Sequence, residues 1–277
     1  MANISENPID IIEICSTFAN EWSMTHQGCA GTLFLLPHDD STQGLDVSSD
    51  FTAEYDLPVE QTEVLTHSSF SFQNTSNAFT NQQVLVNITT PISESWELTH
   101  SVCPGGNDFF TITTPALPSI PGIPSNDSVQ ISDDVTATHS HTYTWDVNQN
   151  ISLPPRSLTK VTFQTTIINV SRNFQFDFWM TGSIGVTSMN PINGSTETYF
   201  PITQVLQWYQ SDLLTLNFEG NRVTCLNKGI YKAIYQNQPQ LLIETTSLDN
   251  PTLIQNSILD LTTGSQTLVN ESNGCCN

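Results

Sequence analysis

In SVQISDDVTATHSHTYTWDV, residues 128–147, polar side chains alternate with mostly apolar or aromatic ones. All ten even-numbered positions are polar, and seven of the ten odd-numbered positions are apolar or aromatic. A period of two is typical of a β-strand, whose successive side chains point to opposite faces. The pattern runs over 20 residues, whereas an average strand has about five or six. The stretch therefore predicts one unusually long amphipathic strand.

A second alternating stretch, 87–103, lies upstream and has the opposite parity, with its apolar residues at even positions. Opposed residues of an antiparallel hairpin have numbers with a constant sum, and their side chains share a face. If this sum is odd, even-numbered residues of 87–103 oppose odd-numbered residues of 128–147, so the apolar faces of the two strands lie on the same side of the hairpin. Between the two stretches lies FFTITTPALPSIPGIPS, residues 109–125, which is apolar, rich in proline and uncharged. We expect a long hairpin over about 87–147 with an apolar tip.

The expected hairpin has two chemically different faces. The apolar face and tip are predicted to comprise Ile88, Ile92, Trp96, Leu98, Val102, Phe109, Phe110, Ile112, Leu117, Ile120, Ile123, Val129, Ile131, Val135, Ala137, Tyr143 and Trp145. The polar face carries three carboxylates, Glu97, Asp134 and Asp146, and no Lys or Arg. In a membrane barrel the apolar residues would face lipid and these carboxylates the lumen.

The rest of the chain is predicted to be mostly β. Charged residues make up 12%, against about 25% in ordinary domains, and Ser, Thr and Asn fill the polar positions. Short alternating strands are expected at 31–37, 67–74, 82–89, 160–167, 173–180, 181–186, 222–226 and 240–246, with loops such as MNPINGST and NQPQ between them. One helix is expected at 8–22, capped by Asn7, with Pro8 in its first turn and Ile11, Cys15, Phe18 and Trp22 at helical spacing.

The charge distribution excludes several partners. The 277 residues include six basic and 27 acidic ones, giving a net charge of −21, and every Lys or Arg lies between 156 and 232. Such a chain repels nucleic acid, so we expect none as a partner. Anionic membrane surfaces are disfavoured for the same reason. A receptor or an apolar insertion would have to mediate any contact with a membrane.

No signal points to an enzyme, a cofactor or a metal. There is no Gly-x-Ser-x-Gly sequence and no Cys-x-x-Cys pair. His139 and His141 share a strand face, but no carboxylate or Cys has matching spacing, so solvated histidines are favoured over a metal site or a pH switch. Asp39-Asp40 and Asp133-Asp134 are interpreted as solvated turns. Six cysteines leave free thiols as the simplest expectation, with intermolecular bridging through Cys275 and Cys276 as the alternative.

Three stretches together resemble the epsilon-toxin and mosquitocidal-toxin family of aerolysin-type pore-forming toxins. In that family, an amphipathic, hydroxyl-rich hairpin is followed by a Val-Pro-Pro segment and then by alternating strands that end near a glycine. The corresponding stretches here are NISLPPRSLTKVTFQTTI (150–167) and FQFDFWMTGSIGV (174–186). NRVTCLNKGIYKAIYQNQPQLLIET (221–245) is similar to the family's late strands around a Gly-x-Tyr turn. Four prolines in the tip and the scarcity of Lys and Arg depart from the family pattern.

The resemblance implies an elongated protein with three parts. Residues 1–75, with parts of 187–220, would form a receptor-binding head, for which Trp22, Trp208 and Tyr209 are the candidate contacts. Residues 76–186 would form the middle region with the insertion hairpin, and 221–277 the distal β-sandwich and C-terminal tail. Family members are commonly made as protoxins and trimmed. They form homo-oligomers on target membranes, to which they bind through a glycan, lipid or protein receptor.

We also expect a chain without a signal peptide, since the N-terminus lacks a basic stretch followed by an apolar run. It would be stored in the producing cell, for example as an inclusion, or released, and would act outside it. Two other interpretations remain open. One is a non-lytic structural or spore-associated β protein joined through its Cys275-Cys276 tail, and the other is a carbohydrate-binding module.

Overall fold

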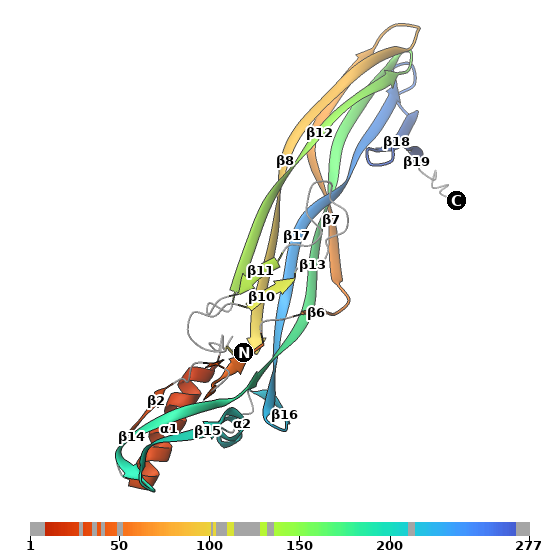
Figure 1. Ribbon diagram of the computed structural model, residues 1–277. Coiled ribbons are helices and arrows are strands. Elements are labelled where there is room, and N and C mark those ends of the chain that lie inside the picture. Colours follow the sequence, from red (N-terminus) through yellow and green to blue (C-terminus); the bar gives the residue numbers. More distant parts are fainter. Residues whose placement is uncertain are drawn as a thin grey trace, which may run out of the picture.

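The computed structural model shows an elongated, mostly antiparallel β molecule (Figure 1). It describes residues 9–27, 30–34, 38–39, 42–48, 52–100, 102–103, 110–113, 128–131, 136–209 and 214–269. Within these ranges there are two helices, and the rest of the regular structure is strand. The expected mostly β, elongated architecture is confirmed. No helix in the described part of the chain is both long and apolar enough to span a bilayer.

Two very long strands form the spine of the molecule. β13 (Ser157–Thr181) and β17 (Arg222–Ser247) run antiparallel, from Ser157 opposite Ser247 to Met180 opposite Val223. At about 3.3 Å per residue, each extends roughly 80 Å. The sequence predicted two shorter strands in place of β13 and two in place of β17. Within β17 it predicted a loop at NQPQ (237–240) and a Gly-x-Tyr turn at Gly229. Both predictions of a break are wrong, because the chain remains paired through these positions.

Further strands extend this sheet on both sides of the spine. β7 (Val59–Asn74), β6 (Glu54–Tyr55) and β5 (Asp46–Val47) pair with β13, while β16 (Thr215–Glu219) and β18 (Ile254–Asp260) pair with β17. β19 (Gln266–Val269) follows β18, and β8 (Thr80–His100) and β12 (Thr136–Leu153) continue the sheet beyond β17. β7 therefore lies along the long sheet, which we call the body, although the sequence assigned residues 1–75 to the head. β17, which lies in the 221–277 region assigned to the distal β-sandwich, pairs with β13 from Val223 to Ser247.

A small α/β unit, which we call the head, occupies one end of the molecule (Figure 1). It contains α1 (Ile11–Gln27), α2 (Ile202–Trp208) and a three-stranded sheet ordered β15 (Ser195–Pro201), β14 (Ser183–Ile192), β2 (Gly31–Phe34). The predicted apolar stripe of α1 is buried or packed on the core. Its start differs from the prediction, since Ile12 N donates to Asp10 Oδ1 at 2.6 Å and Asp10 is the N-cap. Asn7 and Pro8 lie outside the described residues.

Three short pairs complete the described structure. β1 (Ile9–Asp10) pairs in parallel with β9 (Val102–Cys103), β3 (His38–Asp39) pairs with β4 (Thr42–Gln43), and β10 (Phe110–Thr113) pairs with β11 (Ser128–Ile131). Cys15 and Cys225 are free and buried, and burial raises the pKa of each thiol to about 12. The remaining cysteines are not among the side chains that the structure describes.

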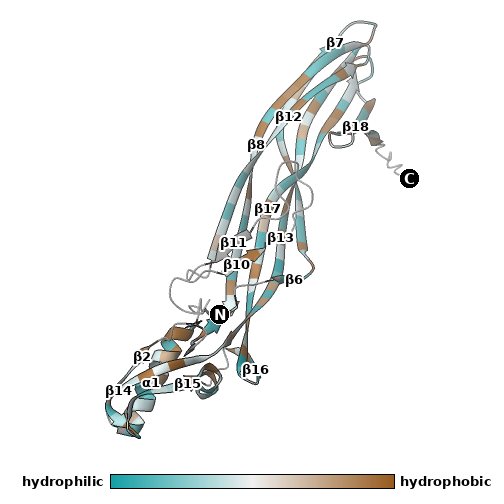
Figure 2. Ribbon diagram, viewed as in Figure 1, coloured by the Kyte–Doolittle hydropathy of each residue, from teal (hydrophilic) through white to brown (hydrophobic). Residues whose placement is uncertain are grey.

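The core consists of two clusters of apolar side chains. One lies under the head and the middle of the body, and the other lies at the far end between β8–β12 and the β13–β17 pair. Figure 2 shows apolar and polar residues alternating along the long strands, as the period-two pattern requires. β12, β13 and β17 thus each bury one face along most of their length.

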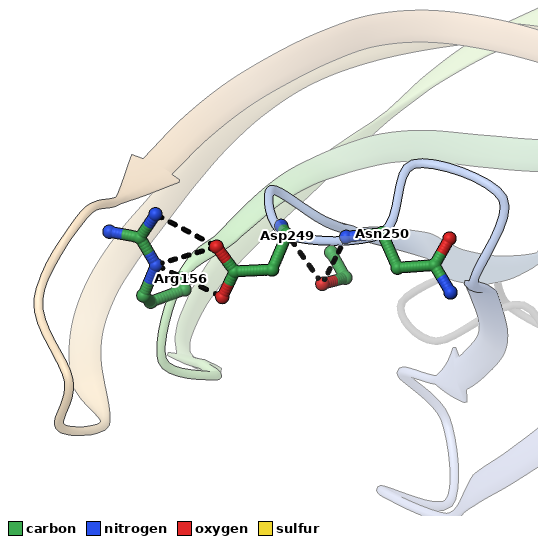
Figure 3. Close-up of polar contacts among 4 residues, drawn as sticks. Arg156, Asp249 and Asn250 are labelled. Atoms are coloured by element: carbon green, nitrogen blue, oxygen red, sulfur yellow. Dashed lines mark hydrogen bonds and ion pairs between the residues drawn. The ribbon is translucent and has the colours of Figure 1, made fainter.

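The Leu-Pro-Pro-Arg segment forms the tight turn from β12 into β13 at the far end (Figure 3). Arg156 has a positive φ of 49° and its carbonyl accepts a hydrogen bond from Leu248 N at 2.8 Å. Its side chain donates from Nε to both carboxylate oxygens of Asp249, at 2.9 and 3.0 Å. Asn74 Nδ2 donates to the carbonyls of Leu153 and Pro154, at 3.2 and 2.8 Å. The Leu-Pro-Pro-Arg turn is therefore hydrogen bonded to two other turns, the one after β7 at Asn74 and the one after β17 at Leu248 and Asp249.

Candidate membrane-insertion hairpin

β8 and β12 form the long hairpin that the sequence predicted. They are antiparallel, and each opposed pair, from Glu97 with Thr136 to Thr80 with Leu153, has numbers adding to 233. The sum is odd, as expected, so the apolar faces of the two strands coincide. The prediction of a long hairpin with an odd sum is confirmed for these two strands. Their pairing extends to Thr80 and Leu153, beyond the expected 87–147.

The two faces have the expected difference in burial. Ile92, Trp96, Leu98 and Trp145 are buried, and Ile88, Ala137 and Tyr143 are partly buried against the core. On the opposite face, Glu97 and Asp146 are exposed. The hairpin therefore covers the body with its apolar face and presents Glu97 and Asp146 to water on the opposite face.

The tip is described only in part. β10 and β11 pair with Phe110 opposite Ile131, and Ile112 is fully buried in the core cluster of the body. The side chains of Val102, Phe110, Val129 and Ile131 are not described. Phe109, Leu117, Ile120, Ile123, Asp134 and Val135 lie outside the described residues altogether.

The hairpin is held to the body along one edge. Among the described strands, β12 pairs with β8 alone, and β8 pairs with β17 only between Ser93 and His100. Several side-chain contacts supplement this short ladder, among them Thr99 Oγ1, which donates to the carbonyl of Lys228 at 3.3 Å. Lys232 Nζ of β17 lies 3.5 Å from a carboxylate oxygen of Glu97, and both side chains are about half exposed. Trp96 Nε1 donates to the hydroxyl of Tyr55 at 3.3 Å.

The buried face also carries ionisable groups that the sequence analysis did not connect. Glu94, only 5% exposed, accepts a hydrogen bond of 2.6 Å from the hydroxyl of Tyr231 on β17. Burial, and then this hydrogen bond, raise the pKa of Tyr231 above its usual value. His139 lies directly opposite Glu94, and His141 is two residues further along β12. Glu94 and the two histidines lie on different strands, and only the observed sum of 233 places Glu94 opposite His139.

The aromatic residues proposed for receptor binding gather in the head. Trp22 of α1 stacks edge-on against Phe200, with ring centroids 4.8 Å apart, and Trp208 of α2 lies 5.3 Å from Phe18. Phe18 and Phe200 are themselves 5.0 Å apart, so they connect the two tryptophans. Trp208 is 39% exposed, and Tyr209 is partly buried. The structure thus brings the three candidates onto one helical unit.

Comparisons with known proteins agree with this architecture. No family model matches the sequence, and no curated protein matches it. Among solved structures, a chain of the Cry23Aa1 and Cry37Aa1 binary complex superposes with a TM-score of 0.62 at 15% identity, covering 95% of this chain and 98% of the other. The β-pore-forming protein Mpp75Aa1.1 from Brevibacillus laterosporus gives 0.58 at 17% identity, with the same coverage of 95% and 98%.

A third similar structure is a non-toxic crystal protein from Bacillus thuringiensis, with a TM-score of 0.59 at 13% identity, covering 87% of this chain and 98% of that one. Identities this low establish the fold alone. The chain therefore has the fold of these crystal and β-pore-forming proteins, which is the aerolysin-type fold that its sequence indicated.

Proposed function

We propose that this protein forms pores, and that the β8–β12 hairpin with its tip is the segment that enters the membrane. One observation carries the proposal: a long amphipathic hairpin at the edge of the sheet is attached to the body through a short stretch of β8. Detaching it breaks pairing with one neighbour only and leaves β13, β17 and β7 paired with each other. An edge hairpin of this kind can leave the body without unfolding it.

Detachment of the hairpin in water would be unfavourable. Ile92, Trp96, Leu98 and Ile112 are each at most 4% exposed. Exposing one such side chain costs about 1.5–3 kcal/mol, so the four together cost roughly 6–12 kcal/mol. A membrane or neighbouring subunits must therefore supply a new apolar environment. In this proposal the head binds the receptor, with Trp22, Trp208 and Tyr209 as contacts.

Association of several subunits would solve the problem of the open strand edge. Unpaired backbone groups are not tolerated in lipid, so spanning strands must close into a barrel. Alternation would then place the apolar face towards lipid and Glu97, Asp134 and Asp146 towards the lumen. We infer a homo-oligomer in which every subunit contributes one hairpin.

A pair of disulfide variants tests hairpin release directly. Ser93 opposes Ile234 of β17 on one side and Ser140 of β12 on the other. Opposed residues in antiparallel sheets have Cα separations that suit a disulfide. Ser93→Cys with Ile234→Cys ties the hairpin to the body, whereas Ser93→Cys with Ser140→Cys ties it only to itself. We expect dye release from susceptible cells or receptor-bearing vesicles to stop in the first variant, to recover on reduction, and to persist in the second.

The same assay separates the two candidate functions. Unchanged release by the first variant, with its disulfide verified by mass spectrometry, would show that the hairpin is not the inserting segment. The fold is shared with a non-toxic crystal protein, and this similarity favours a non-lytic structural role as the second candidate. Absence of release and of a detergent-resistant oligomer, with every protease and target membrane tried, would support that role.

A further inference from the structure

We propose that Glu94, His139 and His141 form a binding site for a divalent transition-metal ion, best matched by Zn²⁺. One ligand atom from each of these residues lies within 4.8 Å of the others. All three side chains project from the same face of the β8–β12 hairpin, since His139 opposes Glu94 and His141 opposes Ile92. Two imidazoles and a carboxylate are a ligand set that Zn²⁺ uses in proteins, leaving a fourth position for water.

The distances require only a small adjustment. Ligand atoms around one tetrahedral Zn²⁺ ion, each about 2.0–2.1 Å from the metal, lie about 3.3 Å apart. The imidazoles of His139 and His141 are already adjacent, with ring centroids 4.4 Å apart. The three ligand atoms lie within 4.8 Å of one another, so a shift of up to about 1.5 Å, which side-chain torsions can supply, would reach this spacing.

Without a bound ion, a buried nitrogen at this position has no hydrogen-bond partner, and the buried carboxylate has no ion-pair partner, among the described residues. No Lys or Arg of the described residues forms an ion pair with Glu94. Arg172 of β13 opposes Tyr231 and acts electrostatically on its hydroxyl, but it makes no ion pair with Glu94. His139 Nδ1 is buried and accepts or donates no hydrogen bond within the described part of the chain. A bound cation would satisfy this nitrogen and neutralise the buried carboxylate.

Tyr231 provides the supporting contact that metal ligands usually have. Its hydroxyl donates to Glu94 Oε1, and a carboxylate hydrogen bonded through one oxygen still offers the other to a metal. Outer contacts of this type orient the ligand, and removing one typically weakens metal binding about 10–100-fold. Tyr231 belongs to β17, so the metal would connect β12 and β8 directly and β17 through Tyr231.

The first experiment measures binding alone. Equilibrium dialysis of the whole chain against Zn²⁺ should give one ion per chain, and Co²⁺ should give the absorption of a tetrahedral site. His139→Asn, His141→Asn and Glu94→Gln should each weaken binding at least about tenfold, and Tyr231→Phe about tenfold. His26→Asn, which changes an exposed histidine of α1, should have no effect. Thermal denaturation identifies any variant that fails to fold. If Glu94→Gln fails to fold, His141→Asn on the edge strand β12 still tests the site.

Unchanged affinity in the His139 and His141 variants, or no bound Zn²⁺ in the unaltered chain, would overturn the proposal. A second readout rests on the proposed function: Zn²⁺ should slow dye release and a chelator should restore it, whereas His141→Asn should be insensitive to both. If no condition produces release, pore formation fails while the dialysis result still decides the metal site. Release that ignores Zn²⁺ despite stoichiometric binding would show that the ion does not restrain the hairpin.

Discussion

His67 connects burial at one residue to the pH dependence of stability. Its Nε2 lies 2.7 Å from Thr165 Oγ1, whose own proton is donated to Gln236 Oε1, so the neutral imidazole carries its proton on Nε2. Burial lowers the pKa of His67 below its usual value of 6.5. As pH falls below 6.5, the unfolded chain binds a proton before the folded one does, so the free energy of unfolding decreases. Above that pH the contribution is complete.

We therefore expect His67→Gln to reduce the loss of stability between about pH 7.5 and about pH 5. Urea denaturation of both proteins at several pH values measures this difference. His26→Gln, on the exposed side of α1, should retain the full pH dependence. Identical slopes for the His67 variant and the unaltered chain would contradict the assignment.

Gly229 of β17 pairs with Leu98 of the hairpin and leaves no room for a side chain. A Cβ at this position would lie 2.6 Å from the carbonyl oxygen of Glu97 on β8 and would clash with the ring of Phe174. Gly229→Ala should therefore push β8 away and cost about 1–3 kcal/mol of stability. If the hairpin inserts, dye release should become faster because its attachment is weaker.

Gly264→Ala is the matched control for this variant. Gly264 has a φ of +70° and no atom near its missing Cβ, and it lies in the turn between β18 and β19. This change should also lower the melting temperature, since it forces alanine into a left-handed conformation, but it should leave the rate of release unaltered. Equal acceleration by both variants would indicate general instability instead of a weakened hairpin attachment.

At the scale of elements, pairing protects the basic residues of β17. Lys228 and Lys232 lie inside a strand that is paired with both β13 and β8. Lys232 is also the last Lys or Arg in the chain. Trypsin should therefore leave residues 233–277 attached, and C-terminal trimming should require a chymotrypsin-like or broad protease. Mass spectrometry of treated, active protein tests this, and a tryptic cut at Lys228 or Lys232 that raises lysis would contradict it.

The elements also show what the sequence could predict. Periodicity is a local property: period-two alternation was sufficient for the hairpin and its parity, and helical spacing of Ile11, Cys15, Phe18 and Trp22 was sufficient for the helix. Continuity of β17 was not predictable from the turn-forming residues NQPQ (237–240), because β13 pairs with Asn237 and Gln240 on either side of the irregularity and keeps the strand in the sheet. Gln238 takes a φ of 53° there, and the register of β13 shifts between Gln164 and Thr166. A bulge absorbs the extra residue, and the strand continues.

The ionisable cluster was missed for a different reason. Glu94 and His139 are 45 positions apart, and only the register of the hairpin makes them neighbours. A search for ligand spacing within one strand cannot find such a site, although the predicted odd sum restricted the possible partners. Residue contacts between strands depend on register, which composition and periodicity leave undetermined by multiples of two.

At the scale of the whole molecule, the uneven charge predicts the ion preference of the proposed pore. There is no Lys or Arg between residues 86 and 155, and the exposed face of the hairpin carries Glu97 and Asp146. In the structure Glu97 lies near Lys232 of the body. Release of the hairpin would separate this pair, so each subunit would bring an uncompensated carboxylate into the barrel.

Repetition in a homo-oligomer turns each carboxylate into a ring, and rings of carboxylates inside a low-dielectric wall attract cations and repel anions. We expect a cation-preferring channel whose preference weakens in Glu97→Gln, Asp134→Asn and Asp146→Asn. Screening acts within about 8 Å at physiological salt, so the preference should be stronger in dilute salt. Reversal potentials in planar bilayers under a salt gradient measure it, with Glu197→Gln in the head strand β15 as the control. An anion-selective channel would mean that the face assigned to the lumen, or the hairpin itself, is wrong.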